Sequence, residues 1–169
     1  SNVDDLIYCF NHAGNIKPGW PIPFHLTGVE FGYTPARGAI GDLNLDGMNE
    51  FVLSGVWDIL AFQFDGTMLP GFHINLPDTT FLFYNAWQPP ALADFDSDGY
   101  LEIITSGNDW SLAHPQNFTS FVAVYNHQGN TENGWPIEIY DHFVLDAVTP
   151  YDIDGDGILE IGIKTNQLT

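Results

Sequence analysis

The sequence predicts an all-β protein built from antiparallel four-stranded repeats, with essentially no helix. Two phrases alternate along its 169 residues: an acidic turn followed by a short apolar run, and an Asn/Asp/Gly turn followed by Gly-aromatic. The acidic turns recur 52 and 58 residues apart, a spacing typical of a four-stranded structural repeat. No segment shows the helical 3.6-residue periodicity.

Each acidic turn places oxygen-bearing side chains at positions 1, 3, 5 and 9 and a glycine at position 6. In chain order these side chains are Asp42, Asn44, Asp46 and Glu50; Asp94, Asp96, Asp98 and Glu102; and Asp152, Asp154, Asp156 and Glu160. Alternate oxygens followed by a tight turn can wrap around one hard cation such as Ca²⁺. Acidic turns without a metal are the weaker interpretation, because the clustered carboxylates would repel one another. The sequence therefore predicts three calcium sites.

These loops are not EF-hands. An EF-hand needs a bidentate Glu at position 12, where this chain has Leu53, Thr105 and Ile163. Instead the last acid, at position 9, opens an apolar run rich in Val, Ile, Leu and Phe, which reads as a buried strand. Each loop is therefore expected at the tip of a β-hairpin, where the ion is structural rather than catalytic.

The order of the two phrases predicts how strands are grouped. If the strands of a repeat are A to D, the metal loop joins A to B and the Gly-aromatic turn joins C to D. The chain then runs C–D, A–D, A–D, A–B, in units spanning residues 1–27, 35–77, 89–140 and 146–169. Strands A are expected at residues 36–41, 90–93 and 147–151, and long insertions at residues 27–35, 77–88, 108–118 and 140–146.

Composition limits the class of partner. Three basic residues stand against 22 acidic ones, giving a net charge of −19, so a nucleic-acid partner is excluded for want of cations. No apolar run is long enough for a membrane helix. Cys9 has no partner for an intrachain disulfide. Weak carboxylate sites fill at extracellular calcium levels, so the expected location is outside the cell or on its surface.

The alternation of Asp-x-Asp-x-Asp-Gly-x-x-Glu with Gly-Trp-Pro resembles the FG-GAP/VCBS repeats of β-propellers, the family that includes integrin α-chain heads and many bacterial surface proteins. The resemblance covers nearly the whole chain. It implies propeller blades and adds to the calcium ligands the backbone carbonyls of Met48, Tyr100 and Ile158. Two features depart from the family: Asn44 replaces an acid, and the chain holds only three blades' worth of strands.

No nucleophile elbow, phosphate loop or zinc motif is present, so the expected protein is not an enzyme. Trp57, Trp87 and Trp110 fall outside the repeat phrases, in B–C or D–A connections. Connections on a rigid scaffold commonly carry binding, and tryptophans favour protein or glycan partners. A protein or glycan ligand is therefore expected on the face opposite the metal hairpins.

The predicted function is a non-catalytic extracellular recognition or assembly module with structural calcium. Two alternatives stay open: a non-catalytic domain of a larger polysaccharide-degrading enzyme, and a self-assembling surface or filament protein. The remaining blades would come from the same parent chain or from another copy, as a homo-oligomer or filament.

Overall fold

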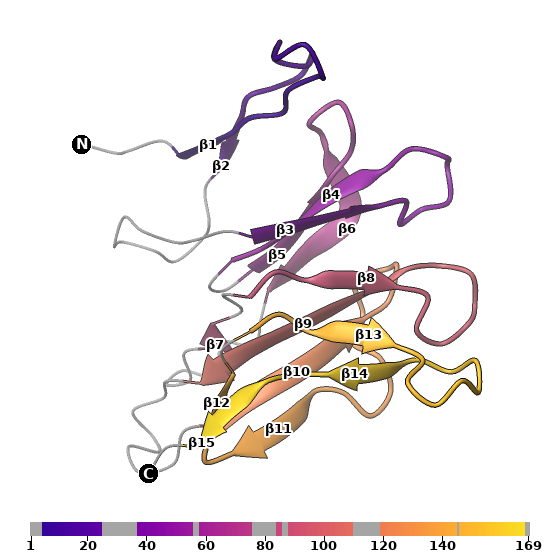
Figure 1. Ribbon diagram of the computed structural model, residues 1–169. Helices are drawn as coiled ribbons and strands as arrows, with labels where there is room; N and C mark the ends of the chain where they lie inside the picture. Colours follow the sequence, from indigo (N-terminus) through magenta and orange to yellow (C-terminus); the bar gives the residue numbers. More distant parts are fainter. Residues whose placement is uncertain are drawn as a thin grey trace.

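The computed structural model describes residues 5–24, 37–55, 58–75, 84–85, 88–109, 119–144 and 146–167. Within these ranges the protein is all-β, every paired strand is antiparallel, and there is no helix. No helix in the described part of the chain could therefore cross a membrane. Four groups of strands follow one another in chain order; the first three run from top to bottom in Figure 1, and the last lies over the second sheet in that view.

The first group, here called the first hairpin, pairs β1 (Asp5–Ile7) with β2 (Ile22–Phe24). Its turn is organised by Asn11, whose Oδ1 accepts the backbone N–H groups of Ala13 and Asn15, both at 3.0 Å. Asn126 accepts the N–H groups of Gln128 and Asn130 in the same way, 115 positions further on. Because Asn side chains readily mimic a backbone turn, the repeated Asn fixes the same hairpin turn twice.

The first sheet contains four strands in the order of the chain. They are β3 (Arg37–Gly41), β4 (Glu50–Ser54), β5 (Asp58–Phe62) and β6 (Met68–Asn75). The second sheet repeats this order with β8 (Ala91–Ala93), β9 (Glu102–Asp109), β10 (Thr119–Tyr125) and β11 (Ile137–Tyr140). A short additional strand, β7 (Tyr84–Asn85), pairs with the far end of β9.

The last group, here called the last hairpin, contains two pairs of short strands. β13 (Thr149–Tyr151) pairs with β14 (Glu160–Gly162), and β12 (His142–Val144) pairs with β15 (Thr165–Gln167). Strands β3, β8 and β13, which each lead into an acidic loop, lie next to one another and form one side of the stack (Figure 1).

Apolar side chains alternate between the two faces of each sheet, so that every sheet packs against both neighbours. In β10, Val122 and Val124 face the last hairpin, and Phe121, Ala123 and Tyr125 face the first sheet. Period-two alternation with both faces buried produces the continuous apolar runs seen in the sequence. The core between the two sheets is formed by Leu43, Val52, Ile59, Ala61, Leu69, Phe72, Ile74, Ile103, Phe121, Ala123 and Tyr125.

A buried polar network ties the second sheet to the last hairpin. Asn108 donates from Nδ2 to the carbonyl of Val144 at 3.0 Å and accepts from the N–H of Val144 at 2.8 Å. Ser120 donates to Asn108 Oδ1 at 2.8 Å and contacts the carbonyl of His142 at 2.6 Å. Since buried polar groups must be paired, this network fixes where β12 sits on the sheet.

The strand boundaries correct the sequence prediction within the insertions, where β9 continues to Asp109 and two short strands appear. The insertion predicted at residues 77–88 contains β7, and the insertion predicted at residues 140–146 contains β12. Each short strand lies just before the strand that leads into an acidic loop, and the pairing register shifts between the two. Tyr84 pairs with Asp109 whereas Ala91 pairs with Ile104, and Val144 pairs with Thr165 whereas Thr149 pairs with Gly162. The same displacement of two residues occurs in both hairpins, so it is a repeated feature of the fold.

Candidate metal centres

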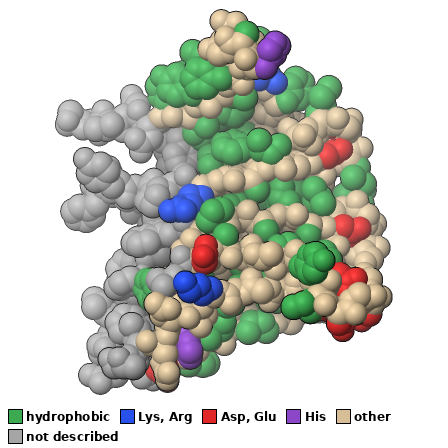
Figure 2. Space-filling view, in the orientation of Figure 1, with side chains coloured by type: hydrophobic (Ala, Val, Ile, Leu, Met, Phe, Trp, Pro, Cys, Tyr) green, Lys and Arg blue, Asp and Glu red, His purple; other side chains and the backbone are tan. Residues whose placement is uncertain are grey.

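The three acidic loops lie at equivalent hairpin tips. The residue before position 1 pairs with position 9 in every case: Gly41 with Glu50, Ala93 with Glu102, and Tyr151 with Glu160. Eight residues therefore connect the two strands each time. The tips project on one side of the stack, where acidic side chains are visible in Figure 2.

Within each loop the acids hold the backbone by hydrogen bonds. The position 9 glutamate accepts the N–H of position 2 through Oε2: Leu43 at 2.9 Å, Phe95 at 2.7 Å and Ile153 at 2.9 Å. The position 1 aspartate accepts the N–H of the position 6 glycine, from 2.9 to 3.2 Å. Both carboxylates are thereby oriented toward the inside of the turn.

In three of these carboxylates the second oxygen has no hydrogen-bonding partner in the described structure. Glu50 Oε1, Glu102 Oε1 and Asp94 Oδ1 are buried without a hydrogen bond. Glu50 and Glu102 are almost completely inaccessible, at 1% and 0% exposure. Burying a carboxylate without full compensation is costly. An oxygen-seeking cation fits this arrangement, because each of these three acids has one oxygen on a backbone N–H group and one free.

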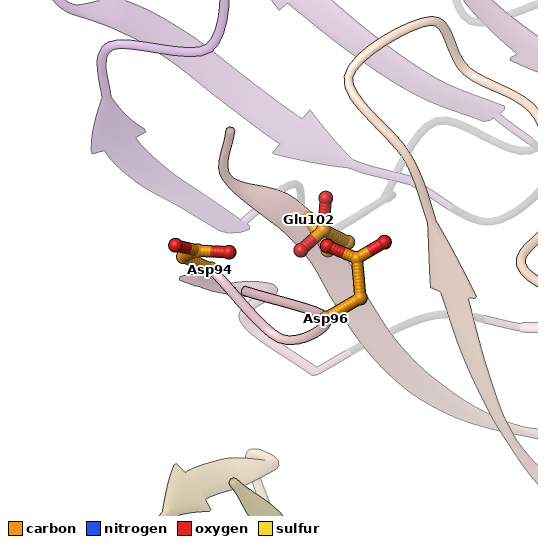
Figure 3. Close-up of side chains that lie close together, drawn as sticks. All are labelled: Asp94, Asp96 and Glu102. Atoms are coloured by element: carbon orange, nitrogen blue, oxygen red, sulfur yellow. The ribbon is translucent and has the colours of Figure 1, made fainter. Parts of the chain in front are cut away.

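In the second and third loops, positions 1, 3 and 9 form a group that can hold a metal ion. One carboxylate oxygen from each of Asp94, Asp96 and Glu102 lies within 4.8 Å of the other two, and the same is true of Asp152, Asp154 and Glu160. Figure 3 shows the first of these groups, with Asp94 and Asp96 on the loop and Glu102 at the start of β9. Oxygens this close can bind one ion directly.

Position 5 behaves differently from the other three. Asp46, Asp98 and Asp156 each accept the N–H of position 7 through Oδ1, at 2.7 to 2.8 Å. Their carboxylates are outside the three-residue groups of the described chain. The structure therefore assembles three of the four predicted side-chain ligands in each of these two loops.

The first loop differs because position 3 is an amide. Asn44 donates from Nδ2 to Asp46 Oδ2 at 3.2 Å and accepts the N–H of Asp46 at 2.9 Å. Asp42 and Glu50 keep their backbone contacts, so the turn has the same form with one carboxylate fewer. Fewer charged ligands lower the affinity for calcium.

Burial changes the acidity of the two best-enclosed glutamates. Burial raises the pKa of Glu102, the N–H of Phe95 opposes this effect, and the charges of Asp96 and Asp98 raise the pKa further. Burial also raises the pKa of Glu50, against the N–H of Leu43, with Asp46 and Asp42 adding to the increase. Both carboxylates are thus disfavoured as free anions, and a bound cation would relieve both causes.

Position 4 adds a backbone requirement that the sequence did not reveal. Leu45 and Ser97 have φ of 58° and 65°, and the third loop has Gly155 there at 81°. Positive φ is uncommon outside glycine, so two loops adopt it with side chains that disfavour it. The apparent Asp-x-Asp spacing gave no signal for this conformation, because position 4 varies in residue type.

The other predicted site residues are placed as follows. Tyr100 stacks on His127 with ring centroids 3.9 Å apart, which connects the second loop to the turn after β10. Met48 and Ile158 are exposed beside their loops. Trp57, Trp87 and Trp110 lie outside the described residues, so the predicted ligand face is not described.

Comparison with known proteins adds no further evidence for this site, since no family model, curated protein or solved structure matches the chain.

Proposed function

We propose that this chain is a non-catalytic, calcium-stabilised β-propeller module that acts outside the cell in recognition or assembly. The observation that carries the calcium proposal is the free buried oxygen of Glu50, Glu102 and Asp94. Hydrogen bonds to the loop fix the other oxygen of each carboxylate, so the free one is already oriented. Three ions, one in each loop, are proposed.

The ion would act as a structural clamp. The ligands at positions 1 and 3 belong to the loop, and the ligand at position 9 belongs to the strand that follows. Binding at all three would hold the hairpin closed and compensate the charge buried at position 9. Because the unfolded chain has no such arrangement, the binding free energy adds to folding stability. We propose the carbonyls of Met48, Tyr100 and Ile158 as additional ligands.

The propeller proposal rests on the repeated arrangement of strands. A four-stranded and a five-stranded antiparallel sheet stack face to face, with the first hairpin on one side and the two strand pairs of the last hairpin on the other. The strands that lead into the three acidic loops, β3, β8 and β13, lie side by side. Radial stacking of four-stranded sheets around their first strands is the plan of a propeller. A protein or glycan ligand contacted by Trp57, Trp87 or Trp110 is proposed on the face opposite the loops.

Thermal unfolding tests the calcium proposal. Millimolar calcium should raise the melting temperature relative to a chelator, and magnesium should do so much less, because it prefers a regular octahedral site with retained waters. Asp154→Ala should reduce the increase, whereas Glu132→Ala, at an acid outside the loops, should leave it intact. Equal melting curves in calcium and chelator would refute the proposal.

Two alternatives remain as proposals. A non-catalytic domain of a polysaccharide-degrading enzyme would show binding on a glycan array, without turnover by this chain. A self-assembling surface protein would show no glycan binding but would associate with itself.

Alanine at Trp57, Trp87 and Trp110 together should abolish ligand binding in the recognition proposal, and binding that survives would place the ligand elsewhere. Glycan or peptide turnover abolished by one acidic or histidine substitution would contradict the non-catalytic proposal.

A further inference from the structure

Equivalent residues of the repeats differ sharply in burial at two surfaces. On the first hairpin, Leu6, Tyr8 and Phe10 are 44%, 49% and 57% exposed. Their counterparts in the second sheet, Phe121, Ala123 and Tyr125, are at most 6% exposed because the first sheet covers them. The rings of Tyr8 and Phe10 stack with their centroids 5.9 Å apart, so their apolar surfaces are continuous.

The second surface is the side of the second sheet that faces the last hairpin. Ile22, Ile74 and Ile137 follow the Gly-aromatic phrase at the same position in three repeats. Ile22 and Ile74 are each 8% exposed because they pack against the following sheet, whereas Ile137 is 47% exposed. The last hairpin covers Val122 and Val124 but leaves Ile137 open.

These two surfaces correspond to the two sides of a contact that already exists in the molecule. Ile74 packs in one core with Phe121, Ala123 and Tyr125. Ile137 is the counterpart of Ile74, and Leu6, Tyr8 and Phe10 are the counterparts of those three residues. By this correspondence, Ile137 is expected to pack on the exposed face formed by Leu6, Tyr8 and Phe10 of a first hairpin.

A cavity beside the first hairpin supplies a second fit. It has a volume of about 340 Å³ and is lined by Tyr8, Phe10, Lys17, Trp20, Phe51 and Phe64, among other residues. In the other two loops the position 2 side chain is covered: Leu43 is 0% exposed, and Phe95 packs edge-on against Trp135 at 5.9 Å. Their counterpart Ile153 is 78% exposed. Trp20, which lines the cavity, is the counterpart of Trp135, and Ile153 is the counterpart of Phe95. Ile153 should therefore pack on Trp20 as Phe95 packs on Trp135.

The strand edges and the charges agree with the same match. In each of the two sheets, the strand after the acidic loop pairs with the next strand of the chain: β4 with β5, and β9 with β10. Their counterparts, β14 in the last hairpin and β1 in the first hairpin, each have only one partner in the described structure. Open edges are pairing templates. Lys17 lines the cavity, where the equivalent turn residue of the second sheet is Glu132. The loop carrying Ile153 has four carboxylates, so this lysine provides charge complementarity.

We propose that the first hairpin of one copy of this chain docks on the last hairpin and second sheet of another copy. β1 then pairs with β14, Tyr8 and Phe10 pack on Ile137, and Ile153 enters the cavity beside Trp20. The contact is heterologous, so repeated use closes a ring or extends a filament. It depends on packing and charge, and it extends beyond the proposed role of calcium.

Paired variants test this contact in the whole chain. Tyr8→Asp removes the first-hairpin side of the contact, and Ile137→Asp removes the opposite side. Met68→Asp is the control, because Met68 is similarly exposed, at 46%, and lies on β6 outside both surfaces. Sedimentation velocity across a dilution series in calcium gives the association state, and circular dichroism confirms that each variant is folded.

The wild-type chain and Met68→Asp should self-associate, and each of the other two variants should be monomeric alone. Mixing Tyr8→Asp with Ile137→Asp should restore a species of two chains, since each provides the surface that the other retains. Misfolding cannot be rescued in this way. A folded wild-type monomer at every concentration, or a mixture of folded variants that stays monomeric, would overturn the proposal.

Discussion

Glu102 divides its carboxylate between two environments. Oε2 accepts the N–H of Phe95 at 2.7 Å, and Oε1 is buried with no hydrogen-bonding partner in the described structure. The side chain itself is inaccessible to water. A buried anion in this position destabilises the metal-free fold and stabilises the calcium-bound fold. Removing the charge of Glu102 should therefore stabilise the metal-free protein and destabilise the calcium-bound protein.

Glu102→Gln tests that reversal. In chelator the variant should be at least as stable as the wild type, because a buried charge near Asp96 and Asp98 is gone. In saturating calcium it should be less stable, by about 3 kcal/mol if the ion is present at roughly 100 times its dissociation constant. Chemical denaturation measures both values. Glu132→Gln is the matched control and should be nearly neutral in both conditions.

The pH dependence follows from the raised pKa values of Glu50 and Glu102. In the metal-free protein the folded state holds these protons more tightly than the unfolded chain does. Stability is therefore greatest below the ordinary glutamate pKa and falls as pH rises through the raised values. In chelator, lowering the pH from about 7 toward 5 should raise the melting temperature.

In saturating calcium the trend should be opposite, because protons compete with the ion for the same carboxylates. The double variant Glu50→Gln/Glu102→Gln should show a smaller change with pH in chelator than the wild type. Melting curves that have the same pH trend with and without calcium would contradict this assignment.

At the scale of secondary-structure elements, the sequence predicted the hairpin tips well and the strand extensions poorly. Strand β4 begins at Glu50, the position 9 acid that the sequence predicted to open a strand, because pairing resumes there after the loop. β7 and β12 were missed because each is short and pairs only after a register shift. That pairing depends on tertiary contacts of the kind Asn108 makes with Val144, which have no local sequence pattern.

Asn108→Ala should weaken the joint between the second sheet and the last hairpin. The substitution leaves both backbone groups of Val144 without their Asn108 partner, and a buried unsatisfied group costs about 1–3 kcal/mol. Denaturant unfolding should show a loss of that order. Asn130→Ala, in an exposed turn, is the control and should change stability by much less. Equal effects of the two substitutions would show that the network does not fix β12.

At the scale of the whole molecule, the stacked sheets and the three loops follow one repeat. Residues of β10 alternate between two cores, so each sheet needs a neighbour on both faces. The sequence showed this as continuous apolar runs, but it could not show that Ile137 and Tyr8 stay exposed while their counterparts are buried. Exposure depends on which sheets are present on either side, and that is a property of the assembled stack.

Calcium stoichiometry, measured by native mass spectrometry of the whole chain, tests the central claim most directly. Three bound ions are expected, with the ion of the Asn44 loop lost first as free calcium is lowered, because that loop has one carboxylate fewer. Glu102→Gln should bind two ions, and Glu132→Gln should still bind three. A chain that binds no calcium at millimolar concentration, or a Glu102→Gln variant that binds as many ions as the wild type, would contradict the account.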